Sequence, residues 1–224
     1  HAEERLSQPT VRATAFFKSA SIDVYALVGD RQQPLPDNDQ RFGFGVTTAD
    51  VIRRGDLGDH ALAVRISGTQ PALDWTAHVF TGLSRRPTFV PRFTADARLA
   101  GIDAVYTDIV QVAGEAETTR ADWRFVAEGF VRNGALDVTG QERTYGYVAA
   151  AAEYQRLGAF NGAYNVIPRF ELLADTRGDR ADIPFASAVR AGMRVATTSL
   201  RPLQIEAGYS YDWAFHGHGF MASL

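Results

Sequence analysis

The sequence has no cysteine among its 224 residues, which excludes disulfide bonds, thiolate metal sites and a cysteine nucleophile. It also has no run of about 18 apolar residues, so no membrane-spanning helix is predicted. The formal net charge is only −3 and the sequence pI is about 6.0, so no basic patch indicates a nucleic-acid partner. Mean hydropathy is −0.17 with 46% hydrophobic residues, values that suit a soluble protein or a transmembrane β-barrel.

The clearest feature that is present is a strict two-residue alternation of apolar and polar side chains over 165–213. In 189–196, for example, Val189, Met193 and Val195 alternate with Arg190 and Arg194. Successive side chains leave a pleated backbone on opposite faces, so this period predicts strands and not helices.

Ten segments of the chain carry this alternation. Those within 165–213 run about ten residues each, whereas strands of globular proteins usually have about 5–6 residues and tilted strands that cross a bilayer need about 9–11. A soluble antiparallel sheet with one wet face would also alternate and remains an alternative. The expected strands are 11–17, 22–28, 62–66, 75–81, 110–118, 123–131, 148–154, 165–175, 189–196 and 203–213.

The connections between these strands fall into two classes that alternate along the chain. Outer-membrane barrels have this asymmetry, with short periplasmic turns and longer outward loops. The sequence therefore predicts an all-β fold: an antiparallel, up-and-down transmembrane β-barrel or a large curved portion of one. The short connections are expected at 18–21, 68–73, 120–122, 156–164 and 199–202, and the longer ones at 29–60, 83–108, 132–144, 176–187 and 214–218.

Two stretches carry a resemblance to a known group. They are Ala63–Trp75 (AVRISGTQPALDW) and Leu172–Arg180 (LLADTRGDR), the latter followed by Ile183-Pro184-Phe185. Both resemble segments of a poorly characterised group of porin-like bacterial outer-membrane proteins, and the resemblance extends loosely from Val11 to Leu224. It implies a location in the bacterial outer membrane, contact with outer-membrane lipid and a polar lumen, and it supplies no catalytic motif.

We expect residues 1–224 to be a single outer-membrane barrel domain that is truncated at both ends. The first residue is His1, and Phe220–Leu224 resembles a strand that has only begun. Members of the group continue with further strands, and an unclosed sheet leaves unpaired edges, so the chain alone should fold poorly in detergent.

The polar sides of the strands are rich in charge. A charge on a lipid face costs about 2–4 kcal/mol for Arg or Lys at the bilayer midplane, so these side chains should face a lumen. There they either sort solutes by a transverse field or merely pair across strands and keep the lumen hydrated. Val166, Phe170, Leu172, Val189, Met193, Ile205 and Tyr209 should point outward. The predicted pore-lining residues are Arg65, Glu115, Glu117, Arg124, Glu128, Glu153, Arg169, Glu171, Arg190, Arg194, Glu206 and Asp212, with Arg12, Asp23 and His78 in the same inward row.

Three features invite other interpretations. Glu115, Glu117 and Glu128 could form a glycosidase acid pair, but acids in a lumen beside Arg124 need no catalytic role. His216-Gly217-His218 could chelate a metal, but no third ligand stands near it in sequence. We therefore expect no enzyme activity, cofactor or metal. Within the strand 165–175, Pro168 removes a ladder donor, which predicts a bulge or a local gap.

The leading functional hypothesis is an outer-membrane, porin-like channel for passive diffusion of small hydrophilic solutes. It rests on the charged inner row and the apolar outer row. The alternative is a non-conducting barrel whose long loops, 29–60 and 83–108, bind a partner, a ligand or a surface polysaccharide. The oligomeric state is open.

Overall fold

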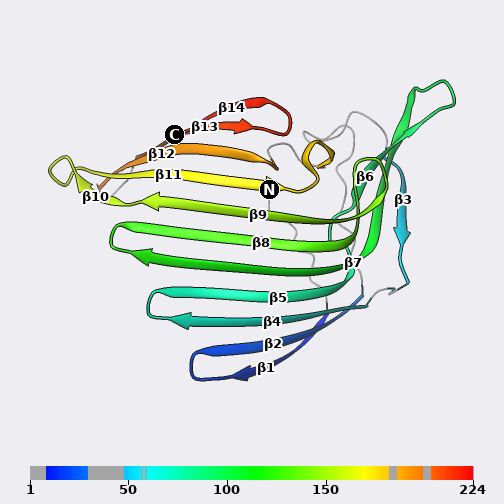
Figure 1. Ribbon diagram of the computed structural model, residues 1–224, viewed down its shortest axis with the longest axis horizontal. Coiled ribbons are helices and arrows are strands. Elements are labelled where there is room, and N and C mark those ends of the chain that lie inside the picture. Colours follow the sequence, from blue (N-terminus) through cyan, green and yellow to red (C-terminus); the bar gives the residue numbers. More distant parts are fainter. Residues whose placement is uncertain are drawn as a thin grey trace.

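The chain forms one β-sheet of 14 strands in a computed structural model that describes residues 9–29, 48–56, 58, 60–181, 186–198 and 203–223 (Figure 1). The strands are β1 (Thr10–Phe16), β2 (Ala20–Val28), β3 (Thr48–Arg54), β4 (His60–Gln70), β5 (Leu73–Leu83), β6 (Thr88–Phe93), β7 (Leu99–Arg120), β8 (Trp123–Leu136), β9 (Glu142–Tyr154), β10 (Arg156–Ala159), β11 (Tyr164–Asp175), β12 (Ala188–Thr197), β13 (Gln204–Asp212) and β14 (Gly217–Ser223).

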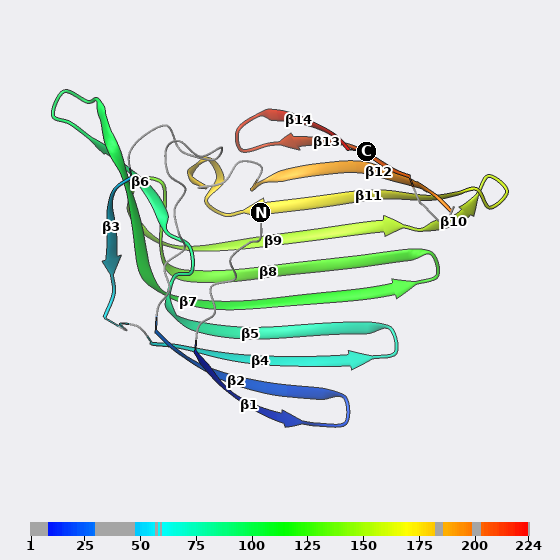
Figure 2. The ribbon, with the colours of Figure 1, turned by 180° about the vertical axis from the view of Figure 1, so that it is seen from behind.

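Most neighbours in the sheet are neighbours in sequence. The path β1-β2-β4-β5-β7-β8-β9-β11-β12-β13-β14 is antiparallel at every step, as Figures 1 and 2 show. Three strands lie off this path: β10 pairs with β11, β6 pairs with β7, and β3 runs parallel to β7. In the described part of the chain, β1 and β14 do not pair with each other. The all-β, antiparallel, up-and-down prediction is confirmed.

All ten strands expected from the alternation are present, as β1, β2, β4, β5, β7, β8, β9, β11, β12 and β13. The only helical turn among the described residues is a three-residue 3-10 segment, Gly178–Arg180, in the connection after β11. No helix built from those residues has the length and apolar character to cross a membrane.

The predicted strict alternation of short and long connections is wrong at two places. Only five residues, 137–141, join β8 to β9, and only four, 213–216, join β13 to β14. An aspartate caps each reversal. Asp137 accepts hydrogen bonds from the backbone N–H groups of Thr139 and Gln141, and Asp212 accepts them from the N–H groups of Ala214 and Phe215. Such side-chain to backbone bonds let a chain reverse tightly.

The other connections follow the prediction where they can be seen. One end of the sheet, here called the turn end, carries the short turns after β1, β4 and β7, on the left in Figure 1. The opposite end, called the rim, carries the β6–β7 hairpin and the 137–141 turn. The expected short connection at 199–202 and residues 30–47 of the first excursion lie outside the described residues.

The second excursion, 83–108, extends the sheet at the rim. Strand β7 is 22 residues long because its first half continues above β5 and is flanked by β6 on one edge and β3 on the other. Ala104, Val105 and Tyr106 are consecutive there and almost fully buried. Burial on both faces explains why this half shows no two-residue period.

The expected irregularity at Pro168 is a gap on one side only. The ladder from β11 to β12 runs through Pro168 without a shift. On the other side the ladder to β9 stops at Arg169, and the ladder to β10 resumes at Val166. Pro168 therefore lies where no partner on that edge requires its missing N–H donor.

The two faces of the sheet differ sharply in composition. Residues paired in register share a face, so the register from β1 to β14 divides the strands into two sets. One set, the apolar face, includes the seven side chains expected to point outward. Many of its large apolar side chains are exposed, which would be unfavourable in water; Val112 is 55% exposed and Phe170 is 53% exposed. The other set, the polar face, carries the charged row.

Candidate functional site

All twelve predicted pore-lining residues lie on the polar face. The register places Arg65 in the row of Asp23 and His78, and it aligns Arg124 with Glu153 and Arg169 through the pairing of β8, β9 and β11. At the C-terminal side of the sheet, Glu171 lies opposite Arg190, Arg194 lies opposite Glu206, and Asp212 lies opposite Ala188. Glu115 lies opposite Glu128, and Glu117 shares their face.

Half of these residues form one chain of ion pairs across five strands. Arg124 donates to Glu117 at 2.7 Å and to Glu153 at 3.1 Å. Glu153 also pairs with Arg169 at 3.4 Å, and Arg169 contacts Glu171. Arg190 then reaches Glu171 at 3.6 Å. Three acids alternate with three arginines, so the chain of pairs is neutral as a whole and stabilises the middle of the polar face.

Glu153 holds a special position in this chain of ion pairs. It is only 6% exposed, and its carboxylate lies between two guanidinium groups. A buried charge is tolerated only when it is paired and hydrogen-bonded. Arg124 also binds Glu117 through two nitrogens, a geometry that strengthens such pairs.

The remaining predicted residues are paired less closely or not at all. Arg65 lies 3.9 Å from Glu115, with both side chains about half exposed. Arg12 and Thr14 both donate to the buried Asp23. Asp212 also lies on the polar face, and its carboxylate accepts hydrogen bonds from backbone N–H groups of the 213–216 turn. Within the described residues, Glu128, Arg194 and Glu206 form no ion pair.

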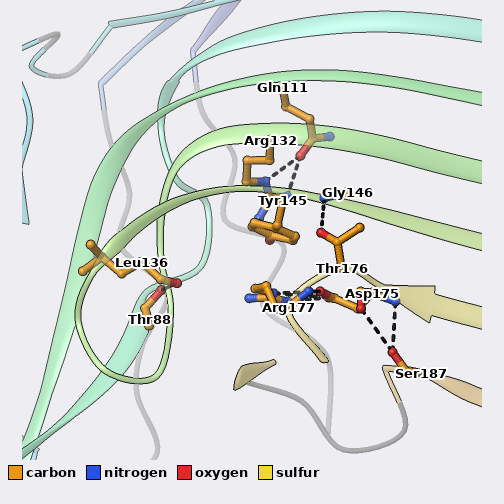
Figure 3. A network of polar contacts seen from close by, with 10 residues as sticks. All are labelled: Thr88, Gln111, Arg132, Leu136, Tyr145, Gly146, Asp175, Thr176, Arg177 and Ser187. Carbon is orange, nitrogen blue, oxygen red and sulfur yellow. Dashed lines mark hydrogen bonds and ion pairs between the residues drawn. The ribbon is translucent and has the colours of Figure 1, made fainter. Parts of the chain in front are cut away.

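A second polar cluster at the rim was not predicted from the sequence (Figure 3). Arg132 donates to Gln111 at 2.8 Å and to the Tyr145 hydroxyl at 3.0 Å. Arg177, from the connection after β11, stacks on the Tyr145 ring with its Cζ 3.8 Å from the ring centroid. It also donates to the buried Asp175 at 2.8 Å. A cation stacked on a desolvated aromatic ring is strongly held, so this connection is fixed to the sheet.

Sequence reasoning missed this cluster because the alternation is interrupted there. Arg132 was assigned to the loop 132–144 and Tyr145 to no strand, whereas β8 and β9 pair through both residues and continue beyond a bulge between Arg132 and Ala135. Extending the period of two by one residue from Val131 would have placed Arg132 on the polar face. Ser187 ties the same region together, because its hydroxyl accepts from the Asp175 N–H.

Two hollows open on the polar face. The larger, of about 620 Å³, lies at the rim beside Arg65, Arg85, Arg132, Tyr145 and Arg177. The other, of about 520 Å³, lies across β11–β14 and is bordered by Arg190, Arg194 and Glu206. Both are large enough for a small solute.

The structure offers no assembled metal site in the part of the chain that it describes. No three His, Asp or Glu side chains gather there in a metal-binding group. His218 lies 2.5 Å from the Tyr209 hydroxyl and His216 lies 3.3 Å from the Tyr211 hydroxyl, both through Nδ1. The two histidines therefore contact tyrosines, and no common ligand site is evident from these contacts.

Comparison with known proteins identifies a structural relative. The outer membrane channel DcaP of Acinetobacter baumannii superimposes on this chain with a TM-score of 0.54 at 12% sequence identity. The chain has the fold of an outer-membrane β-barrel channel. The match covers 96% of this chain and 60% of the channel's own length, so the chain spans well under two thirds of that protein. No family model and no curated protein matches the sequence. The expected resemblance to porin-like barrels is thus confirmed for the fold.

Proposed function

We propose that the protein lies in the bacterial outer membrane and forms a porin-like channel for passive diffusion of small hydrophilic solutes. The observation that carries the proposal is the segregation of charge between the two faces. Along the eleven-strand path, acidic and basic side chains occupy the polar face, whereas the apolar face carries them only at its margins. Asp108 and Glu142 lie there at the rim and Arg120 at the turn end, beside Trp123.

A bilayer accounts for this division. A charged side chain at the midplane of the lipid face costs about 2–4 kcal/mol for Arg or Lys, so a barrel strand can carry charge only toward its lumen or near the interfaces. Trp123 and Tyr154 pack together at the turn end with ring centroids 5.1 Å apart. Aromatic pairs at one level suit the girdle that such barrels place at the membrane surface. Lipid would then cover the exposed apolar face.

The polar face supports passage of solutes. Under this proposal the twelve predicted residues line the pore, and residues 1–224 belong to a single barrel domain. The chain of ion pairs described above neutralises half of these twelve charges, which favours small hydrophilic solutes over strongly charged ones. Arg194, which has no ion partner among the described residues, would set the local field on its side of the pore.

Planar-bilayer recording on the full-length protein tests the proposal. We expect discrete open-channel conductance, and we expect ion selectivity to shift toward cations when Arg190 and Arg194 are both changed to Glu. Arg194→Glu should contribute more than Arg190→Glu because Arg190 is already paired with Glu171. Arg98→Glu, at the exposed β6–β7 hairpin, is the matched control and should leave selectivity unchanged. A silent bilayer would contradict the channel.

A silent bilayer would favour a second candidate, a non-conducting barrel whose rim binds a partner or ligand. The observation behind it is the folded rim itself. Strands β3 and β6 flank the buried first half of β7, and Arg92 of β6 donates to Asp50 of β3 at 3.1 Å. An ordered rim of this kind is a platform on which a partner can dock.

A further inference from the structure

The hollow across β11–β14 contains a pair of facing glycines. Gly192 and Gly208 lie opposite each other on the polar face, with Arg169 in the same row on β11. The hollow measures about 520 Å³. Glycine inside a strand weakens it and often marks a place where another group approaches the backbone closely. This pair of glycines leaves a shelf without side chains between Arg169 of β11 and Met221, the partner of Gly208 on β14.

One edge of the shelf carries two opposite charges that make no ion pair. Arg194 and Glu206 are directly opposed in register, which sets their Cβ atoms about 4.5–5.5 Å apart. Neither forms an ion pair in the described structure, although Arg169, Glu171 and Glu153 nearby are all paired. A salt bridge between two exposed side chains of this kind stabilises a protein by only about 0–1 kcal/mol, so a ligand can compete for both groups.

We propose, on the basis of the channel function above, that this shelf is a subsite for free α-amino acids. An α-amino acid carries its carboxylate and its ammonium on one carbon, a spacing that adjacent Arg and Glu side chains can match. The guanidinium of Arg194 binds the carboxylate through parallel N–H donors, and the Glu206 carboxylate accepts from the ammonium. The side chain of the solute lies on Gly192 and Gly208.

The charge pattern distinguishes this solute class from others. A simple anion would find Glu206 beside Arg194, and a simple cation would find Arg194 beside Glu206, so either gains little from the pair. A neutral sugar uses neither full charge. A zwitterion can bind Arg194 and Glu206 at the same time, and its binding leaves the ion pairs of Glu171 and Arg169 intact. The site therefore favours a small molecule with both charges close together.

Solute uptake into proteoliposomes made with the full-length protein tests this subsite. The probe is labelled alanine, and the reference is lactamide, an uncharged isomer of the same size. We expect alanine entry to be faster than lactamide entry and to saturate. Arg194→Gln or Glu206→Gln should raise the alanine concentration at half-maximal entry roughly tenfold, because each removes the charge from one partner of a charge-assisted hydrogen bond. Lactamide entry should change far less than alanine entry, because lactamide carries no full charge for either group to bind.

A control pair and a second variant keep the test decisive. Arg98→Gln and Asp96→Asn make the same chemical changes in an exposed ion pair at the hairpin tip, and they should leave alanine entry unaltered. Gly208→Leu fills the shelf, and its new Cβ would lie 3.4 Å from the nearest backbone oxygen, an ordinary contact. It should weaken leucine entry far more than glycine entry.

The outcomes separate this inference from the channel itself. Equal entry of alanine and lactamide, with both permeating, would overturn the amino-acid subsite and leave the channel standing. Faster alanine entry that survives both Arg194→Gln and Glu206→Gln would also overturn it. If neither solute enters, the channel and the subsite fail together.

Discussion

Two neighbouring alanines of β9 provide a direct test of which face meets lipid. Ala150 lies on the apolar face, in register with Ala127 and Leu172, whereas Ala151 lies on the polar face opposite Glu171. We predict that Ala150→Arg destabilises the folded protein by about 2–4 kcal/mol in a lipid bilayer, while Ala151→Arg changes stability by less than about 0.5 kcal/mol.

The magnitude follows from the position of Ala150 along β9. It lies four residues from Tyr154, which packs against Trp123 at the turn end. At about 3.4 Å per residue and a tilt of about 40°, Ala150 is roughly 10 Å inward of this aromatic level. That depth is close to the middle of an apolar band about 25 Å tall. The register partners of Ala150 offer no acid to an introduced arginine, whereas Ala151→Arg can reach Glu171.

The measurement is urea unfolding of both variants in phospholipid vesicles, with heat-modifiable gel migration as a second readout of folding. A soluble sheet predicts the reverse order. Ala150 is solvent-exposed in the isolated chain, so an arginine there would be harmless in water, and Ala151 is the more enclosed of the two. Equal stability of the two variants in lipid, or a greater loss with Ala151→Arg, would refute the assignment of the apolar face to the membrane.

Three further predictions concern the polar face and the rim. Glu153→Gln should cost about 2 kcal/mol in the same unfolding assay because it leaves two arginines facing an uncharged, buried group, whereas Glu115→Gln, half exposed, should cost less than about 1 kcal/mol. Burial by itself would raise the pKa of Asp137, but the hydrogen bonds that it accepts lower that pKa from 3.8 to about 2. The stabilisation of its turn should therefore be complete above about pH 3.8 and be lost as the pH falls through about 2, which hydrogen exchange of the turn amides would detect. Gly134→Ala should destabilise by about 1–3 kcal/mol or more, seen as a lower unfolding midpoint, because its φ of 86° is strained for alanine and the new Cβ would lie 2.2 Å from the Asp108 carbonyl oxygen.

The strands and their two faces could be predicted from the sequence because successive side chains of a pleated strand point to opposite faces. In β13, for instance, Ile205 and Tyr209 were expected opposite to Glu206, and the register places them so. The prediction needed no knowledge of which strands are neighbours. It succeeded wherever one face of a strand is apolar and the other is charged.

The rim could not be predicted in this way because its strands lack that contrast. The sequence of β6 has only six residues and contains a proline. Strand β3 pairs in parallel with a segment of β7 far along the chain, a contact that no local pattern encodes. The first half of β7 is buried on both faces, so its apolar residues run consecutively.

The candidate site was predictable as a face but not as a set of partners. The alternation within each strand predicted that Arg124, Glu153 and Arg169 lie on one face of the sheet. The ion pairs between them, however, depend on the register of β8, β9 and β11. A slip of one residue would send every one of these charges to the other face. Register therefore determines both which charges meet and which, like Arg194 and Glu206, remain available to a solute.

The distribution of paired and unpaired charges connects the fold to the proposed channel. Burying Glu153 between two arginines fixes the middle strands, because breaking a buried pair is costly. Arg194 and Glu206 border the same hollow as part of that network but form no ion pair with it, and they lie beside glycines that add little to the stability of the sheet. The ion-paired residues thus stabilise the sheet, and under the proposal above the unpaired ones bind the solute. A charged side chain that is already in an ion pair contributes little to solute binding. We therefore expect the unpaired charges, and not the chain of ion pairs, to determine which solutes the channel prefers.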